Sequence, residues 1–217
     1  MRTRLGIGAA VLVLLGVALG ADQATPPTAA DLAARVQAHY ATVRDFTAGF
    51  TVSQRSALMV KTLVERGDVK VKKPGRMRWI YKSPEPKEFV ADGSQLYAYH
   101  PKDKYVMISA LPPPDQTSAA LLFLSGRGDL TRDFTAAVPA KHPEGEWRLE
   151  LTPRSRQADF TSLTLDVDRA TLQMRGVIVV DDNGESSFRF ANLRENQGLS
   201  DQVFVFQIPK GVERIRR

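Results

Sequence analysis

Apolar and polar residues alternate along most of the chain from Phe46 onward, and this alternation constrains the fold more than any other sequence feature. A period of two is typical of β-strands that bury one face and expose the other. In the first such segment Phe46, Phe50 and Val52 share one face, and threonines occupy the other. Short turn signals, such as Pro74-Gly75, separate the segments, which favours antiparallel neighbours over parallel crossovers. The pattern therefore predicts a mainly β (α+β) fold built on an antiparallel meander.

The alternating segments predict ten or eleven strands in one domain. A chain of 217 residues with 43% hydrophobic residues is long enough to bury one substantial core, and no internal repeat divides it. The expected strands span residues 46–53, 61–73, 76–82, 88–91, 95–100, 105–111, 147–152, 160–168, 172–181, 186–193 and 203–208.

Two segments have helical patterns, and two or three helices are expected in all. Residues 29–44 place Leu32, Val36 and Tyr40 on one face, with Thr28 as the N-cap. Residues 116–125 follow a second good N-cap, are unusually apolar and end at a glycine. Helices with such apolar stripes need a partner surface, so we expect both to cover the apolar face of the sheet.

The first twenty residues have the three parts of a secretory signal. Arg2 and Arg4 precede a charge-free apolar stretch, and small residues stand before a cleavage point at Ala21. The sixteen apolar residues are fewer than the roughly 20 that span a bilayer, so cleavage is expected. Export without any cysteine indicates the periplasm of a Gram-negative bacterium. The expected organisation is a signal peptide at 1–20, a flexible leader at 21–28 and a single domain at 29–217.

The residues that perform most enzyme chemistry are missing or scattered. The absence of cysteine excludes thiol catalysis, thiolate metal sites and disulfides, and the three histidines are far apart. No nucleotide-binding loop, nucleophile elbow or metalloprotease motif occurs. Asp181 and Asp182 are interpreted as turn residues, and Asp166 and Asp168 as the outer face of a strand. We therefore expect no catalytic residues, no metal and no cofactor; a lipid or envelope hydrolase would need a nucleophile–base pair that the sequence does not show.

The net charge of +6 is typical of nucleic-acid binding proteins, but its distribution argues against nucleic acid. Removal of Arg2 and Arg4 lowers it to +4, and most basic residues alternate with apolar ones, as on a solvated outer face of a sheet. Lys73 is an exception, because alternation from Val69 and Val71 places it on the apolar face. Either it ends its strand and extends its ammonium to water, or it contacts a helix carbonyl or a lipid head group at the rim of that face.

Three blocks of sequence carry a family resemblance: GDVKVKKPGRMRW at 67–79, FVADG at 89–93 with LYAY at 96–99, and FVFQIPKGV at 204–212. A signal peptide, an amphipathic helix, the pair Phe46 and Phe50, and then Gln54 complete the order. Together they resemble the LolA family, periplasmic carriers that move lipoproteins from the inner to the outer membrane. The resemblance spans nearly all of the chain after the signal peptide.

The resemblance implies an unclosed, strongly curved antiparallel β-barrel with helices as a lid over an apolar cavity that holds acyl chains. It implies a non-enzymatic monomer whose partners are lipidated proteins, an inner-membrane lipoprotein-releasing transporter and an outer-membrane lipoprotein receptor. Lys73 is expected at the contact between lid and rim. The expected cavity residues are Phe46, Phe50, Val52, Leu63, Val69, Val71, Met77, Trp79, Tyr81 and Phe89, and the expected lid residues are Leu32, Val36, Tyr40, Leu121, Leu122 and Leu124.

Two positions differ from the usual family pattern. Lys73 stands where an arginine commonly ties lid to barrel, and lysine lacks the planar fork of donors that makes several carbonyl contacts. Met77 stands where an aromatic residue is common. Two alternatives stay open: a LolA-like lipid-binding or sensor module for another lipid or lipidated partner, and an apolar face that is simply a packed core.

Overall fold

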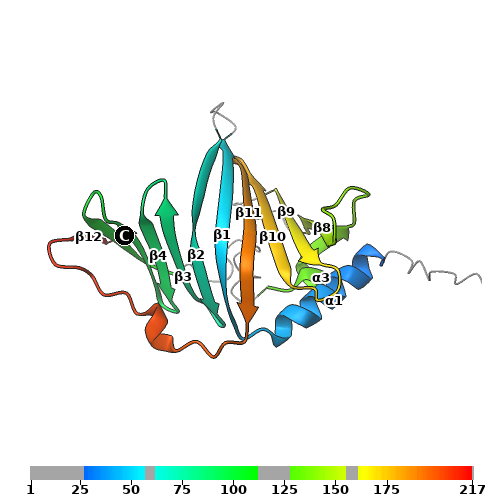
Figure 1. Cartoon of the computed structure of the whole chain (residues 1–217), viewed down its shortest axis with the longest axis horizontal. Coiled ribbons are helices and arrows are strands. Elements are labelled where there is room, and N and C mark those ends of the chain that lie inside the picture. Colours follow the sequence, from blue (N-terminus) through cyan, green and yellow to red (C-terminus); the bar gives the residue numbers. More distant parts are fainter. Residues whose placement is uncertain (1–26, 57–61, 112–127, 155–160, 217) are drawn as a thin grey trace, which may run out of the picture.

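A twelve-stranded sheet dominates the computed structural model, which describes residues 27–56, 62–111, 128–154 and 161–216 (Figure 1). The strand order is β12-β6-β5-β4-β3-β2-β1-β11-β10-β9-β8-β7. The sheet is strongly curved, and its end strands β12 and β7 are not paired with each other, so it forms the expected unclosed barrel. Every pairing is antiparallel except that of β12 with β6.

Ten of the predicted strands are present, with ends that differ by a few residues from those expected. The strands are β1 (Asp45–Ser56), β2 (Leu63–Lys72), β3 (Arg76–Ser83), β4 (Lys87–Asp92), β5 (Gln95–His100), β6 (Tyr105–Ala110), β7 (Phe134–Ala137), β8 (Glu146–Pro153), β9 (Ser162–Asp168), β10 (Met174–Asp181), β11 (Gly184–Glu195) and β12 (Glu213–Arg216).

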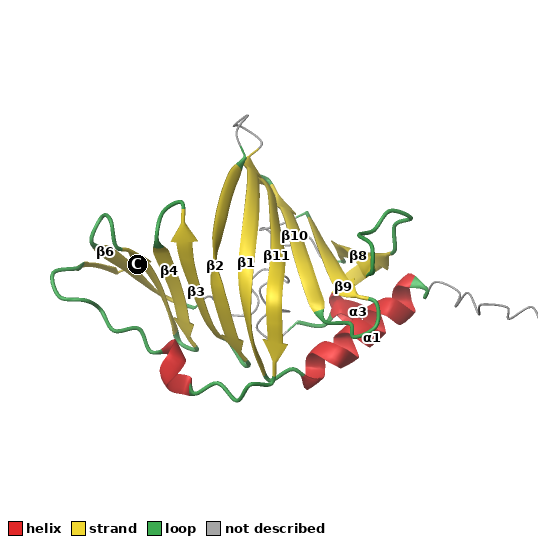
Figure 2. Ribbon diagram, in the orientation of Figure 1, coloured by secondary structure: helices red, strands yellow, loops and turns green. Residues whose placement is uncertain are grey.

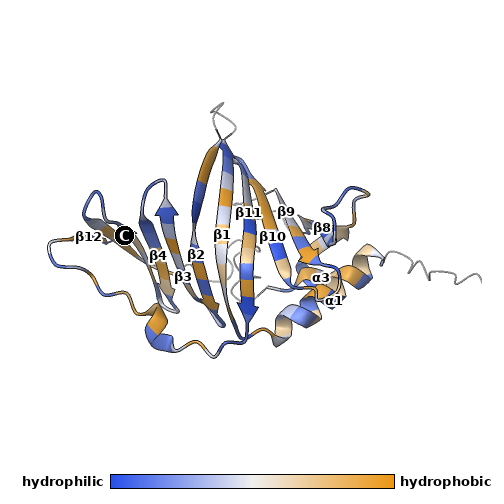
Figure 3. Cartoon of the chain, viewed as in Figure 1, coloured by the Kyte–Doolittle hydropathy of each residue, from blue (hydrophilic) through white to orange (hydrophobic). Residues whose placement is uncertain are grey.

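The alternation of the sequence gives the sheet two chemically different faces. Phe46 lies opposite Val71 on β2, and Val71 lies opposite Met77 on β3, so paired residues continue one apolar face across the strands. We call this the inner face, because its residues join those of the first helix in the main core. The outer face carries the polar partners, such as Lys70 and Arg78. Figure 3 shows the resulting change of hydropathy from residue to residue along the strands.

The first predicted helix is confirmed as α1 (Ala29–Thr42), and the Thr28 side chain accepts a hydrogen bond from the Asp31 N–H as its N-cap. Leu32, Val36 and Tyr40 form its buried stripe. The helix contacts β7, β8 and the short helix α3 (Leu130–Asp133), and Figure 2 shows α1 and α3 together beside β8 and β9. Thus α1 covers one part of the inner face. The predicted helix at 116–125, with Leu121, Leu122 and Leu124, lies outside the described residues.

The predicted strand at 203–208 is wrong, because this segment lies on the face of the sheet and pairs with no strand. Residues 196–212, here called the C-terminal strap, contain the 3₁₀ helix η2 (Asp201–Phe204), which contacts β3 and β4. Phe204 is buried, and the Phe206 ring lies 5.4 Å from that of Tyr97 on β5. Two apolar side chains facing a sheet surface produce the same sequence pattern as a strand.

Three short elements were not foreseen from the sequence. The helix α3 begins after Asp129, whose carboxylate accepts hydrogen bonds from the N–H groups of Thr131 and Arg132, and β7 follows it directly. The strand β12 pairs in parallel with β6. Each of these elements has four residues, which is too short for either period to be recognised.

Candidate functional site

Aromatic side chains cluster on the inner face near the middle of the sheet. The Phe50 ring on β1 packs edge-on against Trp79 and Tyr81 of β3, with ring centroids 5.1 and 4.9 Å apart. Tyr81 in turn contacts Phe89 of β4 at 5.6 Å, and Trp79 contacts Phe188 of β11 at 5.5 Å. We call these five residues the aromatic strip. It continues one apolar surface across four strands, with edge-to-face contacts typical of well-packed aromatic groups.

Most of the aromatic strip is not fully buried. Phe50 is buried, whereas Trp79, Tyr81, Phe89 and Phe188 are half-buried. These residues lie on β3, β4 and β11, whereas the strands that α1 contacts most extensively are β7 and β8. Half-buried aromatic side chains leave part of their apolar surface accessible.

The structure divides the predicted cavity residues into three groups. Trp79, Tyr81 and Phe89 belong to the half-buried strip. Leu63, at the first position of β2, is 43% exposed and lies outside the buried cluster. The remaining residues are buried in the main core, and Phe50 is among them as the buried member of the strip: Phe46, Phe50, Val52, Val69, Val71 and Met77.

Phe188 is a member of the aromatic strip that was missing from the predicted site. Its strand was predicted at 186–193, and alternation there places Phe188 and Phe190 on one face. The signal was therefore present, but only the register shows that this face continues the inner face, with Val52 opposite Phe188 and Phe50 opposite Phe190.

Lys73 joins the end of β2 to the end of α1. Its ammonium donates a hydrogen bond to the Tyr40 carbonyl and lies 3.5 Å from the centroid of the Tyr40 ring. Its backbone N–H donates to the Arg44 carbonyl at 2.9 Å. The ammonium therefore contacts a helix carbonyl at the rim of the inner face, where carbonyl groups in the last turn of α1 have no partner four residues further along the helix.

Burial controls the electrostatics of this junction. It lowers the pKa of Lys73 to about 8, against a smaller opposite effect of the Glu195 carboxylate. Burial also raises the pKa of the Tyr40 hydroxyl well above its usual value, again with a contribution from Glu195. Glu195 itself lies 3.2 Å from the Nε2 atom of His39 on α1. The C-terminal end of α1, the end of β2 and the end of β11 therefore lie together in one partly buried cluster of polar side chains.

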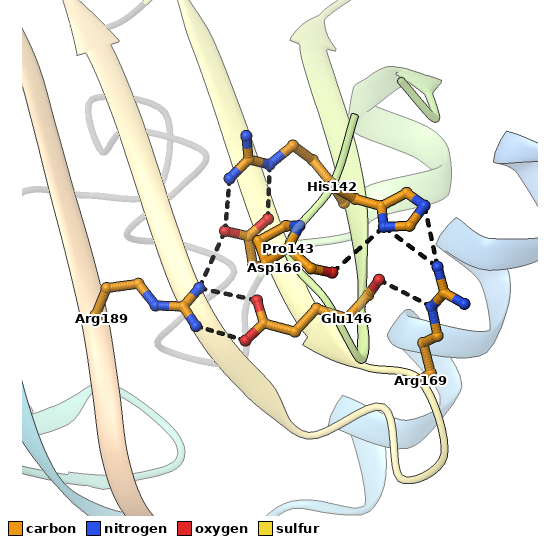
Figure 4. A network of polar contacts seen from close by, with 7 residues as sticks. His142, Pro143, Glu146, Asp166, Arg169 and Arg189 are labelled. Atoms are coloured by element: carbon orange, nitrogen blue, oxygen red, sulfur yellow. Dashed lines mark hydrogen bonds and ion pairs between the residues drawn. The ribbon is translucent and has the colours of Figure 1, made fainter. Parts of the chain in front are cut away.

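The outer face carries a separate network of ion pairs (Figure 4). Asp166 was predicted on this face, and both its carboxylate oxygens accept hydrogen bonds from Arg148, at 2.8 and 2.9 Å. Arg189 reaches Asp166 at 3.2 Å and also binds Glu146. The two arginines cover Asp166, which is therefore buried although it lies on the outer face. Every acid in this network is paired with arginine, which is typical of a structural network.

The described residues contain no group of three His, Asp or Glu side chains that could hold a metal ion. Nor is any helix within these residues long and apolar enough to cross a membrane. The aromatic strip on the inner face is suited to burial of a ligand's apolar surface.

These features define the class of unclosed, curved β-sheets that carry helices on an apolar inner face. The chain belongs to the LolA family, since the family model described as "Outer membrane lipoprotein carrier protein LolA" matches residues 41–207. The match includes the whole aromatic strip and Lys73.

Two relatives named outer-membrane lipoprotein carrier protein extend the match over most of the chain. The protein of Chromohalobacter salexigens is 29% identical over 205 residues, which cover 92% of this chain and 95% of the relative. That of Hahella chejuensis is 29% identical over 175 residues, covering 80% and 83%. The fold is similar to the crystal structure of an uncharacterised conserved protein from Thermus thermophilus, with a TM-score of 0.54, 15% identity and coverage of 85% of this chain and 99% of the other.

Proposed function

We propose that this protein is a periplasmic carrier that binds the acyl chains of lipidated proteins on its inner face and moves them from the inner to the outer membrane. The observation that carries the proposal is the half-buried aromatic strip on the inner face of an open sheet. The family membership and the names of the relatives support it.

The strip suits acyl chains physically. Burial of a methylene group contributes about 0.8 kcal/mol, so one long chain provides a strong driving force without any specific polar contact. Trp79, Tyr81, Phe89 and Phe188 would contact the chain, and the buried residues beneath them would hold these rings in place. Met77 adds a flexible side chain at the edge of this surface.

Release of the cargo requires that the cover of the inner face opens. In this proposal α1 is part of the lid, and Lys73 ties its last turn to β2 through the Tyr40 carbonyl. Because a single ammonium makes fewer directed contacts than a guanidinium, this connection is weaker than an arginine would provide. A weak connection favours exchange between closed and open states.

The proposal includes the expected processing and partners. The segment at 1–20 would direct export and be removed, and a domain beginning near residue 29 would act in the periplasm. An inner-membrane transporter would supply the lipidated protein, and an outer-membrane receptor would accept it. The carrier is expected to act as a monomer, without cofactor or metal and without chemical change to its cargo.

Binding of a fluorescent acyl probe tests the central step. In a Trp147→Phe background, tryptophan emission reports on Trp79 alone, because the chain has two tryptophans. We expect saturable binding and a shift of the Trp79 emission, with weaker binding when Phe188 is replaced by alanine. Flat emission and no uptake at saturating probe would contradict carriage of acyl chains.

Depletion of the protein in its host distinguishes a carrier from a sensor. Loss of a carrier should leave lipidated proteins in the inner membrane, as measured by membrane fractionation. Normal sorting together with acyl binding in vitro would instead favour a module that binds a lipidated partner without moving it.

A further inference from the structure

An ion pair interrupts the apolar surface of the inner face beside the aromatic strip. Glu65 on β2 lies opposite Val52 of β1, and Lys87 on β4 lies opposite Tyr81 of β3, so both belong to the inner face. The Lys87 ammonium contacts the two Glu65 carboxylate oxygens at 2.8 and 3.0 Å. The pair therefore bridges β2 and β4 across β3. Alternation from Val69 also assigns Glu65 to the inner face, but this residue was not singled out from the sequence.

Stability alone does not explain an ion pair at this place. Removal of two charges from water costs several kcal/mol per ion, and apolar residues of similar size often serve as well or better in such positions. Val52 and Phe50 occupy the neighbouring inner-face positions of β1 and are buried. The ion pair thus occupies positions where apolar residues would continue the surface of the strip.

Of the two partners in this ion pair, the hydrogen-bond donor Lys87 is the more accessible. The Glu65 side chain is only 4% exposed, whereas that of Lys87 is 23% exposed. The ammonium lies 4.5 Å from the centroid of the Tyr81 ring.

The Tyr81 hydroxyl is a second donor at this place. It has no hydrogen-bond partner among the residues that the structure describes. Burial, with a smaller contribution from the Glu65 carboxylate, raises the pKa of this hydroxyl to about 12, so it stays protonated at neutral pH. Lys87, with its ammonium over the Tyr81 ring, and the Tyr81 hydroxyl therefore both provide donors at the edge of the aromatic strip.

We propose that Glu65, Lys87 and Tyr81 form a polar subsite that binds the carbonyl oxygen of the ester or amide that joins an acyl chain to its head group. The inference rests on the proposed function, and it adds an orientation to it. The hydrocarbon part lies on Trp79, Phe89 and Phe188, and the carbonyl end lies at Lys87. Glu65 holds the ammonium in place and is a positioning residue.

The charge of the subsite favours a carbonyl group over an anion. Glu65 and Lys87 together carry no net charge, and the Glu65 carboxylate would repel a phosphate or a free carboxylate. A carbonyl group accepts a hydrogen bond without adding charge to a partly buried place. The subsite therefore suits a neutral acyl ester or amide better than a fatty-acid anion.

Matched probes test this inference on the purified exported protein, from which the segment at 1–20 has been removed. We compare a pyrene-labelled alkane with the methyl ester and the free acid of the same chain length. Wild-type protein is expected to bind the ester about tenfold more tightly than the alkane, the size expected for a hydrogen bond from a charged donor. In the double variant E65L/K87M this preference should disappear while alkane binding is retained. Y81F should lose part of the preference.

The double variant removes both charges, so neither is left buried without its partner. The matched control is D68L/K82M, which removes an ion pair between β2 and β3 on the outer face and should leave the preference unchanged. Equal changes in ester and alkane affinity in E65L/K87M, or a wild-type preference for the free acid, would overturn the subsite. Failure of wild-type protein to bind any of the probes would instead contradict the proposed function. Thermal unfolding checks that each variant is folded.

Discussion

Gly67 shows how one residue shapes the aromatic strip. A Cβ atom at this position would lie 2.0 Å from the Ile80 carbonyl oxygen and 2.9 Å from the Cε1 atom of the Phe50 ring. The register of β2 and β3 shifts between Arg66 and Gly67, which brings the β3 backbone close. The absence of a side chain therefore gives Phe50 its place against Trp79 and Tyr81.

We predict that Gly67→Ala lowers the free energy of unfolding by about 2 to 3 kcal/mol, because an added methyl group must displace backbone or the Phe50 ring. Urea denaturation measures the change. Gly49→Ala is the matched control on β1, since its Cβ would meet only ordinary contacts at 3.8 and 3.9 Å. Equal stability of the two variants would show that the strip adjusts without cost.

Lys73 should give the folded protein a specific pH dependence. Its pKa is about 8 in the folded state, where burial lowers it, and returns to its ordinary value of 10.5 on unfolding. Between these values the unfolded chain binds more protons at Lys73, so the contribution of this residue to stability rises with pH. Below pH 8 both states are protonated, and the contribution is constant.

Arginine keeps its charge throughout this range, so Lys73→Arg should lack this dependence. We expect the difference in the free energy of unfolding, wild type minus variant, to be flat at neutral pH and to increase between pH 8 and 10. Urea denaturation at several pH values measures it. Parallel curves for the two proteins would indicate that Lys73 is as solvated in the folded state as in the unfolded chain.

At the scale of elements, polar and apolar contacts hold the C-terminal strap against the outer face of the sheet. The Asp45 carboxylate accepts hydrogen bonds from the N–H groups of Gln197 and Gly198, at 2.7 and 3.0 Å. Arg78 donates to the Val203 carbonyl at 2.8 Å, and Phe204 is only 1% exposed. The strap then leads to β12, which covers the edge of β6.

We predict that Phe204→Ala lowers the free energy of unfolding by about 3 to 5 kcal/mol, the usual cost of removing a buried phenylalanine ring. Val205→Ala is the control, because Val205 is 46% exposed and should change stability by less than about 0.5 kcal/mol. Denaturation by urea measures both. A small effect of Phe204→Ala would mean that the strap is not part of the cooperative fold.

The elements that the sequence predicted well are those with several periods of a pattern. The helix α1 with its Thr28 cap and ten strands follow from such patterns. The strap was mistaken for a strand because the apolar residues Phe204 and Phe206 are two positions apart. Such alternation indicates that one side of a segment is buried, but it does not show whether the segment is paired in a sheet or lies across the face of one. The strands β7 and β12 form the two edges of the sheet, and each pairs with a single neighbouring strand. Because these pairings exist only in the assembled sheet, the local sequence did not predict the two strands.

At the scale of the molecule, the sequence identified the apolar inner face but not which part of it stays accessible. Val71 and Trp79 have the same place in the alternation, yet Val71 is fully buried and Trp79 is half-buried. The difference depends on what the assembled fold packs against each strand, which no local pattern encodes. For the same reason Phe188, from a distant strand, joined the site only when the register was known.

The position of the half-buried strip leads to a prediction for the whole protein in its host. A photo-crosslinking amino acid at Phe89 lies on the inner face beside Tyr81, so it should capture lipidated proteins during transport. The same amino acid at Lys82, exposed on the outer face of β3, should capture few of them. Immunoblotting for a lipidated protein measures both adducts. Replacement of the acylated cysteine in that protein should abolish the Phe89 adduct, because the contact depends on the acyl chains. An adduct that persists without acylation would mean that the inner face binds the polypeptide of the cargo, and the acyl-carrier mechanism would then be wrong.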